Sequence, residues 1–198
     1  MGFLSVFTVY NAHADKTTDL MKTATEKASR GDFQAAIEDF NSAISFDSSN
    51  PYPYAGLGGI YSSRGEIDKA IEYFNKSISL DDRNLKAYIG LGNAYFKKED
   101  TDKAIAYYNK VIFRDQNNIP AYIGLGNAYL KKKDTDRAIE SFNRAIAIDD
   151  KNIPAYFGLG QAYHLRNDDV KKAEIINKLE ELDKNSADKL KQLQDINP

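Results

Sequence analysis

Every 34 residues the sequence returns to the same order of tyrosine, glycine and leucine. One six-residue segment occurs four times, at residues 53–58, 87–92, 121–126 and 155–160. A second shared segment follows at residues 68–71, 102–105 and 136–139, with residues 34–37 as an earlier, looser copy. A fixed period of this length indicates supersecondary units that bury their apolar faces by stacking. The period defines five repeats, at residues 17–50, 51–84, 85–118, 119–152 and 153–185.

Each repeat contains the pattern of two amphipathic helices. With positions numbered 1 to 34, positions 4, 7, 8 and 11 carry Tyr, Leu, Gly and Tyr in repeats 2 to 5. On a helix these positions fall within one stripe about 100° wide. Positions 20, 24 and 28 carry Ala, an aromatic residue and Ile in repeats 1 to 4, which predicts a second helix.

Residues that favour helix ends stand between these segments. An asparagine precedes each first helix and suits an N-cap: Asn50, Asn84, Asn118 and Asn152. Proline, which costs little in the first helical turn, follows at Pro51, Pro120 and Pro154. Acidic residues at positions 16 and 18 complement the dipole at the start of each second helix, as at Asp100, Asp102, Asp134 and Asp136.

These residues resemble the tetratricopeptide repeat consensus. That consensus has an aromatic residue at position 4, Leu-Gly at 7 and 8, Tyr at 11, Gly at 15, Ala at 20 and an aromatic residue at 24. The resemblance covers roughly residues 17–185 and implies an all-α fold. Such a fold is a right-handed α-solenoid of about five stacked helix-turn-helix units with a C-terminal capping helix. The sequence departs from the consensus at position 15, where Glu99, Lys133 and Asn167 replace glycine.

The glycines at positions 6 and 8 lead to two expectations. We expect those at position 8, such as Gly58 and Gly126, to face the alanines at position 20 and let two helices approach closely. Glycine at position 6 costs about 1 kcal/mol relative to alanine in a helix, yet it recurs in repeats 2 to 5. Either a groove needs room there, or the glycine was copied with the repeat.

The two ends of the chain differ from the repeats. Residues 1–16 contain a short apolar run followed by Ala12-His13-Ala14, which resembles the end of a signal peptide but lacks its basic start. The alternative is a disordered N-terminal arm. The location therefore stays open between the cytoplasm and, for a signal-peptide remnant, export to the periplasm. Residues 186–198 are expected to form a capping helix and tail, with Leu190 and Leu193 facing inward.

Composition argues against several functions. With 27 basic and 29 acidic side chains, the net charge of -2 gives no field that favours nucleic acid. The chain has no cysteine, and its two histidines, His13 and His164, are far apart in sequence. We therefore expect no metal, no cofactor and no catalytic cluster, and the chain is not expected to be an enzyme. No apolar run has the roughly 18 residues of a transmembrane helix.

The family resemblance assigns positions 5, 9 and 12 of the first helices to a concave groove. Apolar and amide side chains alternate there, which suits a peptide whose side chains fill pockets and whose backbone pairs with carboxamides. The alternative is that these residues only contact neighbouring repeats. The candidate groove residues are Ala55, Ile89, Asn93, Phe96, Ile123, Asn127, Leu130, Phe157, Gln161 and His164.

The kind of partner is constrained less sharply. The family's carboxylate clamp for chaperone C-termini needs lysine at position 5 and is missing, so that ligand is not expected. Basic residues near the ends of the first helices suit either an acidic partner or the helix dipoles alone: Arg64, Lys97, Lys98, Lys131, Lys132, Lys133 and Arg166. The leading hypothesis is a scaffold for a protein or peptide partner. The alternative is self-assembly into a homo-oligomer through a solenoid end or the N-terminal segment.

Overall fold

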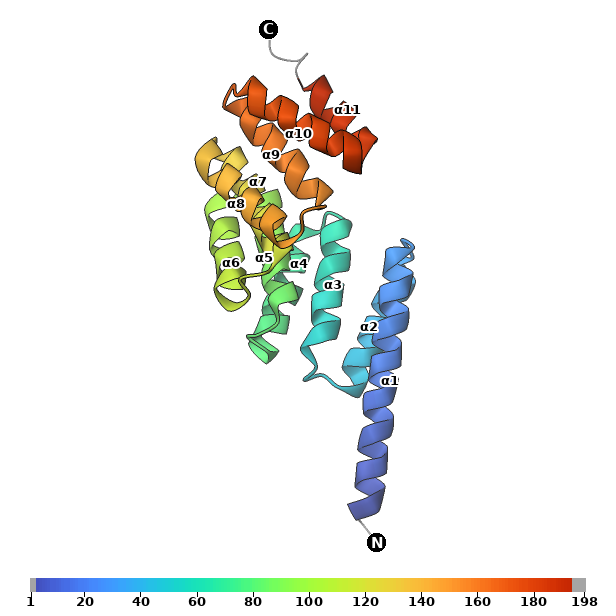
Figure 1. Ribbon diagram of the computed structural model, residues 1–198. Helices are drawn as coiled ribbons and strands as arrows, with labels where there is room; N and C mark the ends of the chain where they lie inside the picture. Colours follow the sequence, from blue (N-terminus) through green and yellow to red (C-terminus); the bar gives the residue numbers. More distant parts are fainter. Residues whose placement is uncertain (1–2, 194–198) are drawn as a thin grey trace. The chain divides into compact units, whose positions relative to one another are not determined.

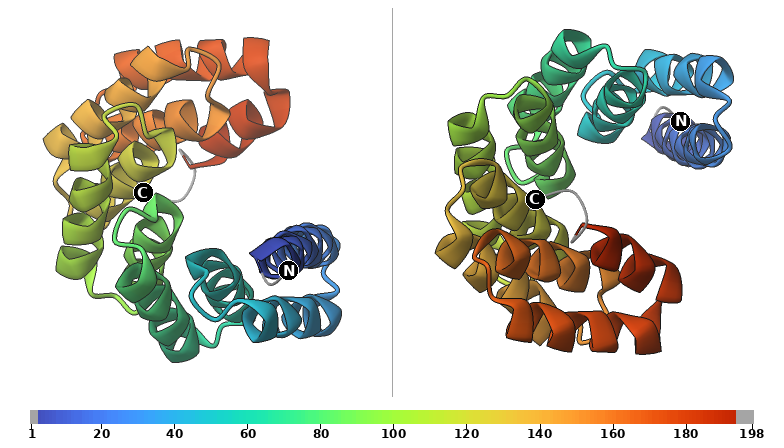
Figure 2. Two further views of the ribbon diagram at one scale, coloured as in Figure 1. Left: turned by 90° about the horizontal axis from the view of Figure 1, so that it is seen from below. Right: turned by 90° about the horizontal axis from the view of Figure 1, so that it is seen from above.

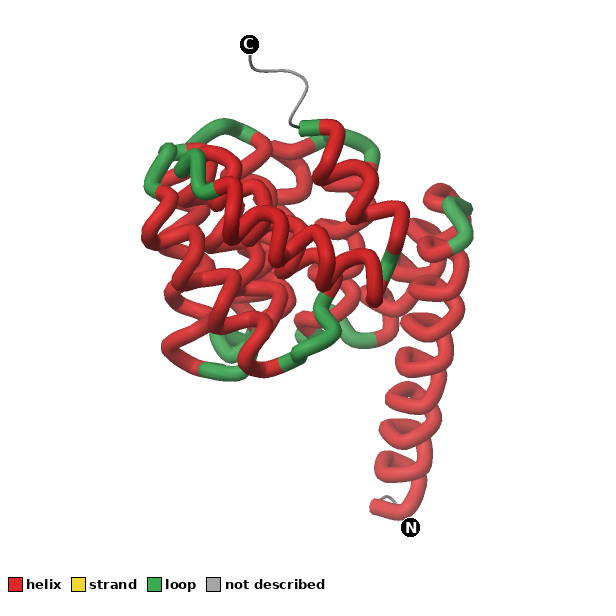
Figure 3. The backbone as a smooth tube through the Cα atoms, turned by 45° about the horizontal axis from the view of Figure 1, so that its top comes forward, coloured by secondary structure: helices red, strands yellow, loops and turns green. Residues whose placement is uncertain are grey.

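The computed structural model describes the backbone of residues 3–193 and the side chains of residues 16–193. Within this range the secondary structure is entirely α-helical, with short connecting turns (Figures 1 and 3). This confirms the predicted all-α solenoid of helix pairs. The helices are α1 (Phe3–Ser29), α2 (Phe33–Phe46), α3 (Pro51–Ser63), α4 (Ile67–Leu80), α5 (Leu85–Lys97), α6 (Thr101–Arg114), α7 (Ile119–Lys131), α8 (Thr135–Ile148), α9 (Ile153–Leu165), α10 (Asp169–Leu182) and α11 (Lys184–Gln192).

The chain forms two compact units, Met1–Lys97 with α1 to α5 and Lys98–Pro198 with α6 to α11. In the first unit α3 contacts both α1 and α5, and these three helices lie along one side with α2 and α4 behind them (Figure 2). In the second unit α7 contacts α9 in the same way, and α11 packs on both α9 and α10. Each unit therefore has its own row of first helices.

Helix starts follow the local signals in the sequence. The side-chain oxygens of Asn50, Asn118 and Asn152 accept hydrogen bonds from the amides of the following first turns, as predicted. The residue at position 16 caps the second helix of the repeat. The side chains of Asp100 and Asp134 accept hydrogen bonds from the backbone amides three residues later, each at 3.2 Å. Local capping therefore fixes where both helices of a repeat begin.

The turn between the two helices of a repeat requires a left-handed residue at position 15. Gly31 and Gly65 adopt φ of 87° and 79° there without steric cost. Glu99, Lys133 and Asn167 occupy the same position with φ of 66°, 59° and 58°. These side chains strain single turns without changing the path of the chain.

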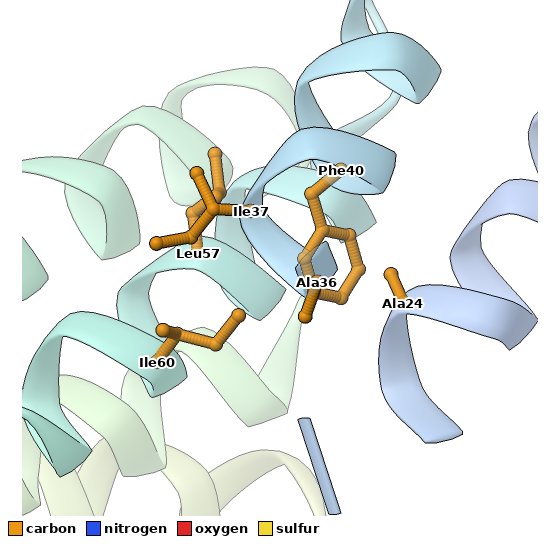
Figure 4. Packing of buried hydrophobic residues seen from close by; sticks show 6 residues of the cluster. All are labelled: Ala24, Ala36, Ile37, Phe40, Leu57 and Ile60. Atoms are coloured by element: carbon orange, nitrogen blue, oxygen red, sulfur yellow. The ribbon is translucent and has the colours of Figure 1, made fainter. Parts of the chain in front are cut away.

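The buried residues include the consensus positions. In the first unit α1, α2 and α3 enclose Ala24, Phe40 and Leu57, with Ala36, Ile37 and Ile60 beside them (Figure 4). At the C-terminal end α10 and α11 enclose Leu179 and Leu190. Leu190 is fully buried and Leu193 partly buried, in line with the capping helix expected from the sequence.

The expected contacts of the glycines were wrong. A Cβ atom on Gly58 or Gly126 would come within 3.0 Å of the aromatic ring at position 24, not of the alanine at position 20. Glycine at position 6 also makes room for a ring: a Cβ atom on Gly90 or Gly158 would meet the position-24 ring of the preceding repeat. Gly56 and Gly90 in addition line hollows of the first unit. Phe74 thus lies between Gly58 and Gly90, and Phe142 between Gly126 and Gly158, so each ring is held by two helices.

The first helix is longer than the repeat requires. α1 spans 27 residues, whereas α2 spans 14, and its N-terminal half extends beyond α2 (Figure 1). The boundary expected at residue 16 falls inside α1, which begins at Phe3. Propagating an existing helix is much easier than starting one, which accounts for the continuity. A signal peptide in this segment stays a prediction. In residues 3–193 no helix is long and apolar enough to cross a bilayer.

Candidate functional site

The first unit has a hollow of about 450 Å³ between α1 and α3. Met21 and Thr25 line it from α1, and Ala55 and Gly59 line it from α3. Phe40 of α2 and Lys86 of α5 also line it. Most of this lining is apolar or small, so the hollow can accept an aliphatic or aromatic side chain.

A second hollow, of about 500 Å³, lies between α3 and α5. It contains four of the candidate groove residues, and these are Ala55, Ile89, Asn93 and Phe96. Both hollows share Ala55, Gly59, Ser63 and Lys86, so they adjoin one another. We call this pair of hollows the first-unit groove.

Repeat spacing determines which residues line the groove. Positions 5 and 9 are occupied by Met21 and Thr25 in repeat 1 and by Ala55 and Gly59 in repeat 2. A Cβ atom on Gly59 would meet no heavy atom within 4 Å, so the backbone of α3 lies open at the centre of the groove. Gly59 lies at position 9, which the sequence assigned to the groove, whereas Met21, Thr25 and Lys86 were not predicted, although their positions in the 34-residue frame could have identified them.

The polar groups of the groove are few. Lys97 donates from Nζ to the backbone oxygen of Ser62 at 3.0 Å, which fixes one end of the second hollow. Lys86 is exposed where the hollows adjoin and has no hydrogen bond or ion pair within residues 16–193. Asn93 is exposed on α5. The groove therefore combines apolar walls with a carboxamide and an ammonium group that is open to a ligand carboxylate.

The other six candidate residues lie in the second unit. Ile123 and Leu130 are partly buried on α7, Asn127 is exposed, and Gln161 is partly buried on α9. Phe157 packs against the cluster of α10 and α11 that contains Leu179 and Leu190, so it helps to hold the cap in place.

His164 is engaged within the protein. Its Nδ1 lies 3.3 Å from Nζ of Lys172, which also lies 3.0 Å from a carboxylate oxygen of Asp169. Lys172 takes position 20, which is alanine in repeats 1 to 4, and is only 2% exposed. Its methylene chain fills the helix interface while its ammonium group reaches these two partners.

The basic residues near the ends of the first helices are largely paired. Lys131 lies 3.1 Å from Glu99, and Arg166 lies 2.9 Å from Asp168. A backbone hydrogen bond from Lys171, followed by the Arg166 pair, holds the pKa of Asp168 below its usual value. Because these basic residues already have acidic partners within the protein, we interpret them as stabilising the repeats and not as a site for an acidic partner. Among residues 16–193 no group of three acidic or histidine side chains is arranged to hold a metal ion.

Comparisons with known proteins agree with this architecture. A family model described as TPR repeat matches residues 58–99 and 126–166, and one described as Tetratricopeptide repeat matches residues 85–118. Together these matches span more than half of the chain. No curated protein sequence matches it.

Solved structures extend the comparison. The crystal structure of MamA protein is 31% identical, with a TM-score of 0.68, and the match covers 84% of this chain and 93% of that chain. YrrB, described as a TPR protein with an unusual peptide-binding site, is 20% identical with a TM-score of 0.67, covering 94% and 97%. The pilF protein of Pseudomonas aeruginosa is 15% identical with a TM-score of 0.78, covering 84% and 76%. The last two show the shared fold alone. From its repeat matches and its identity to MamA, the chain belongs to the tetratricopeptide repeat family.

Proposed function

We propose that the first-unit groove binds an extended segment of a partner protein. The observation that carries this proposal is the pair of adjoining hollows, which meet over the open backbone at Gly59. Hollows of about 450 and 500 Å³ are each large enough for one or two side chains. A segment that places apolar side chains in both hollows spans α1, α3 and α5.

The polar groups suggest the chemistry of this segment. Asn93 has a carboxamide that can pair with the backbone of an extended chain. Lys86, free of partners among residues 16–193, favours a carboxylate between the two apolar side chains. The expected ligand is therefore an apolar segment with an acidic residue near its centre.

The family supports the general role. Tetratricopeptide proteins are typically non-catalytic modules for protein interaction, and the match to MamA extends over 93% of that chain. YrrB, which shares the fold, is described as having a peptide-binding site. The chain is accordingly a protein-interaction scaffold. The assignment of its binding site to the first-unit groove is our proposal.

A substitution at Gly59 tests the groove directly. Gly59→Leu places a side chain in the open space and is expected to lower the affinity for peptides selected from a random phage-displayed library by about tenfold or more. Asn93→Ala removes one carboxamide and should lower affinity by about two- to tenfold. Asn127→Ala, at the same repeat position in the second unit, is the matched control. Undiminished binding by Gly59→Leu would rule out the first-unit groove.

Self-assembly is the second candidate, and the length of α1 favours it. The N-terminal half of α1 extends beyond α2, and this segment is where another copy of the chain would bind (Figure 1). Sedimentation equilibrium over a wide concentration range tests this function. A species that stays monomeric at every concentration would exclude it.

A further inference from the structure

The second unit has a hollow that lies away from positions 5, 9 and 12 of its first helices. It measures about 450 Å³, is open to solvent and is lined by α6, α7 and α8. Tyr122 and Tyr129 line it from α7, Phe113 from α6, and Ser141 and Arg144 from α8. We call it the α6–α8 hollow.

One substitution within the repeat accounts for this space. In repeat 2 the position-23 residue, Tyr73, stacks on the position-11 residue, Tyr61, with ring centroids 5.2 Å apart and an angle of 4°. In repeat 1 the same two positions form an ion pair, Lys27 with Asp39, at 2.6 Å. Position 23 of repeat 4 is Ser141, whose hydroxyl donates to the backbone oxygen of Arg137 at 2.7 Å. No tyrosine from position 23 therefore lies on Tyr129, whose side chain is 9% exposed and has the guanidinium group of Arg137 over its ring.

A second departure from the repeat falls in the same place. Phe113 occupies position 29, where repeats 1, 2 and 4 have Ser45, Ser79 and Ala147. It is 86% exposed, the highest value for a large apolar side chain in residues 16–193. Compared with repeat 2, the α6–α8 hollow has a serine in place of the inner tyrosine and an exposed phenylalanine at its edge. Phe113 therefore offers aromatic surface to a ligand.

Charges at the edge restrict the ligand further. Arg137 is engaged by Asp134 and lies over the ring of Tyr129, 4.4 Å from its centroid. Arg144 has no hydrogen bond or ion pair within residues 16–193, so its guanidinium group is free to bind a ligand carboxylate. Glu140, on the same helix, repels a carboxylate on its own side and so orients the ligand toward Arg144.

We propose that the α6–α8 hollow binds an aromatic side chain of a partner protein that has an acidic residue beside it. The ring takes the place that Tyr73 fills in repeat 2, beside Phe113 and against the Arg137 guanidinium group that lies over the buried Tyr129. The neighbouring carboxylate pairs with Arg144. This site is separate from the first-unit groove and does not depend on it.

Three short synthetic peptides test the proposal by NMR titration of the full-length chain. The first has Asp-Phe-Asp at its centre, the second Asp-Ala-Asp and the third Lys-Phe-Lys. We expect millimolar or tighter binding of the first, with shifts at Phe113 and Ser141, and about tenfold weaker binding of the other two. Equal binding of all three, or no shift with the first at millimolar concentration, would overturn the proposal.

Variants locate the binding. Ser141→Tyr restores the residue of repeat 2, so it should fold, fill the space and weaken binding of the Asp-Phe-Asp peptide by about tenfold or more. Ser141→Ala leaves the hollow open and is its control. Arg144→Glu should abolish the preference for Asp over Lys beside the ring. Gly59→Leu should leave this binding unchanged while blocking the first-unit groove. Wild-type affinity in both Ser141→Tyr and Arg144→Glu would refute the site.

Discussion

Adjacent glycines in α3 give a direct test of how the aromatic rings are held. Gly58 and Gly59 share one helix, but a Cβ atom on Gly58 would lie 2.7 Å from two carbons of the Phe74 ring, whereas a Cβ on Gly59 would meet nothing within 4 Å. Phe74 cannot retreat from α3, because Gly90 holds it on the other side. Alanine at these two sites should therefore have opposite consequences.

The magnitudes follow from two contributions. Alanine stabilises a helix interior by about 1 kcal/mol relative to glycine, and this gain applies to both variants. Overpacking against a ring that cannot move costs about 1–3 kcal/mol and applies to Gly58→Ala alone. Gly59→Ala should raise the free energy of unfolding by about 1 kcal/mol, and Gly58→Ala should change it by between about 0 and -2 kcal/mol.

Urea denaturation followed by circular dichroism at the helical band measures both variants. The difference between them, about 1–3 kcal/mol, isolates the contact with Phe74. Phe74→Leu in the Gly58→Ala background should recover part of the loss, because the smaller side chain leaves room for the methyl group. Equal stabilisation by both alanines would show that the Phe74 ring can move and is not held in place between Gly58 and Gly90.

Two further predictions concern single turns and acid stability. Lys133→Gly should raise stability by about 1 kcal/mol, because φ of 59° is strained for lysine, and Gly65→Lys should lower it by a similar amount; urea midpoints at neutral pH measure both. A side-chain hydrogen bond from Arg137 lowers the pKa of Asp134 below its usual 3.8, so its stabilisation is fully present above pH 3.8 and is lost as the pH falls further. Asp134→Asn keeps an N-cap that does not titrate. Its urea midpoint should therefore fall less than that of the wild type between pH 5 and pH 3. The same fall in both proteins would show that the Asp134 carboxylate does not contribute to acid stability.

The helices and their caps were predictable because they depend on local sequence. Asn118 caps α7 through an amide three residues away, and no knowledge of distant contacts is needed to expect this. The glycine contacts were not predictable in the same way. Positions 6 and 8 lie about 200° apart on a helix, so they face different neighbours. A helical wheel gives these directions but does not say which helix lies in each of them, so it does not predict the rings that pack beside the glycines.

The candidate site was predictable in part for a related reason. The wheel placed Ala55, Ile89, Asn93 and Phe96 on one side, and the structure brings them to one hollow. The candidate residues did not include Met21 and Thr25 of repeat 1, which line the adjoining hollow. The α6–α8 hollow was missed because it depends on a side chain that is smaller than its counterpart in repeat 2. The missing ring at Ser141 is recognised only when the contacts of repeat 4 are compared with the stacked tyrosines of repeat 2.

The rings at position 24 have a consequence for how the chain can change length. Phe142 belongs to repeat 4 but also fits the glycine of repeat 5, and each of repeats 2 to 4 brings one ring at position 24 and glycines at positions 6 and 8. Duplication or loss of a whole copy therefore preserves complementarity at the new junction without compensating mutations. The pattern changes at Gly160, which faces Leu190 of α11 in place of an aromatic ring, so a copy inserted after repeat 5 would have to displace this leucine.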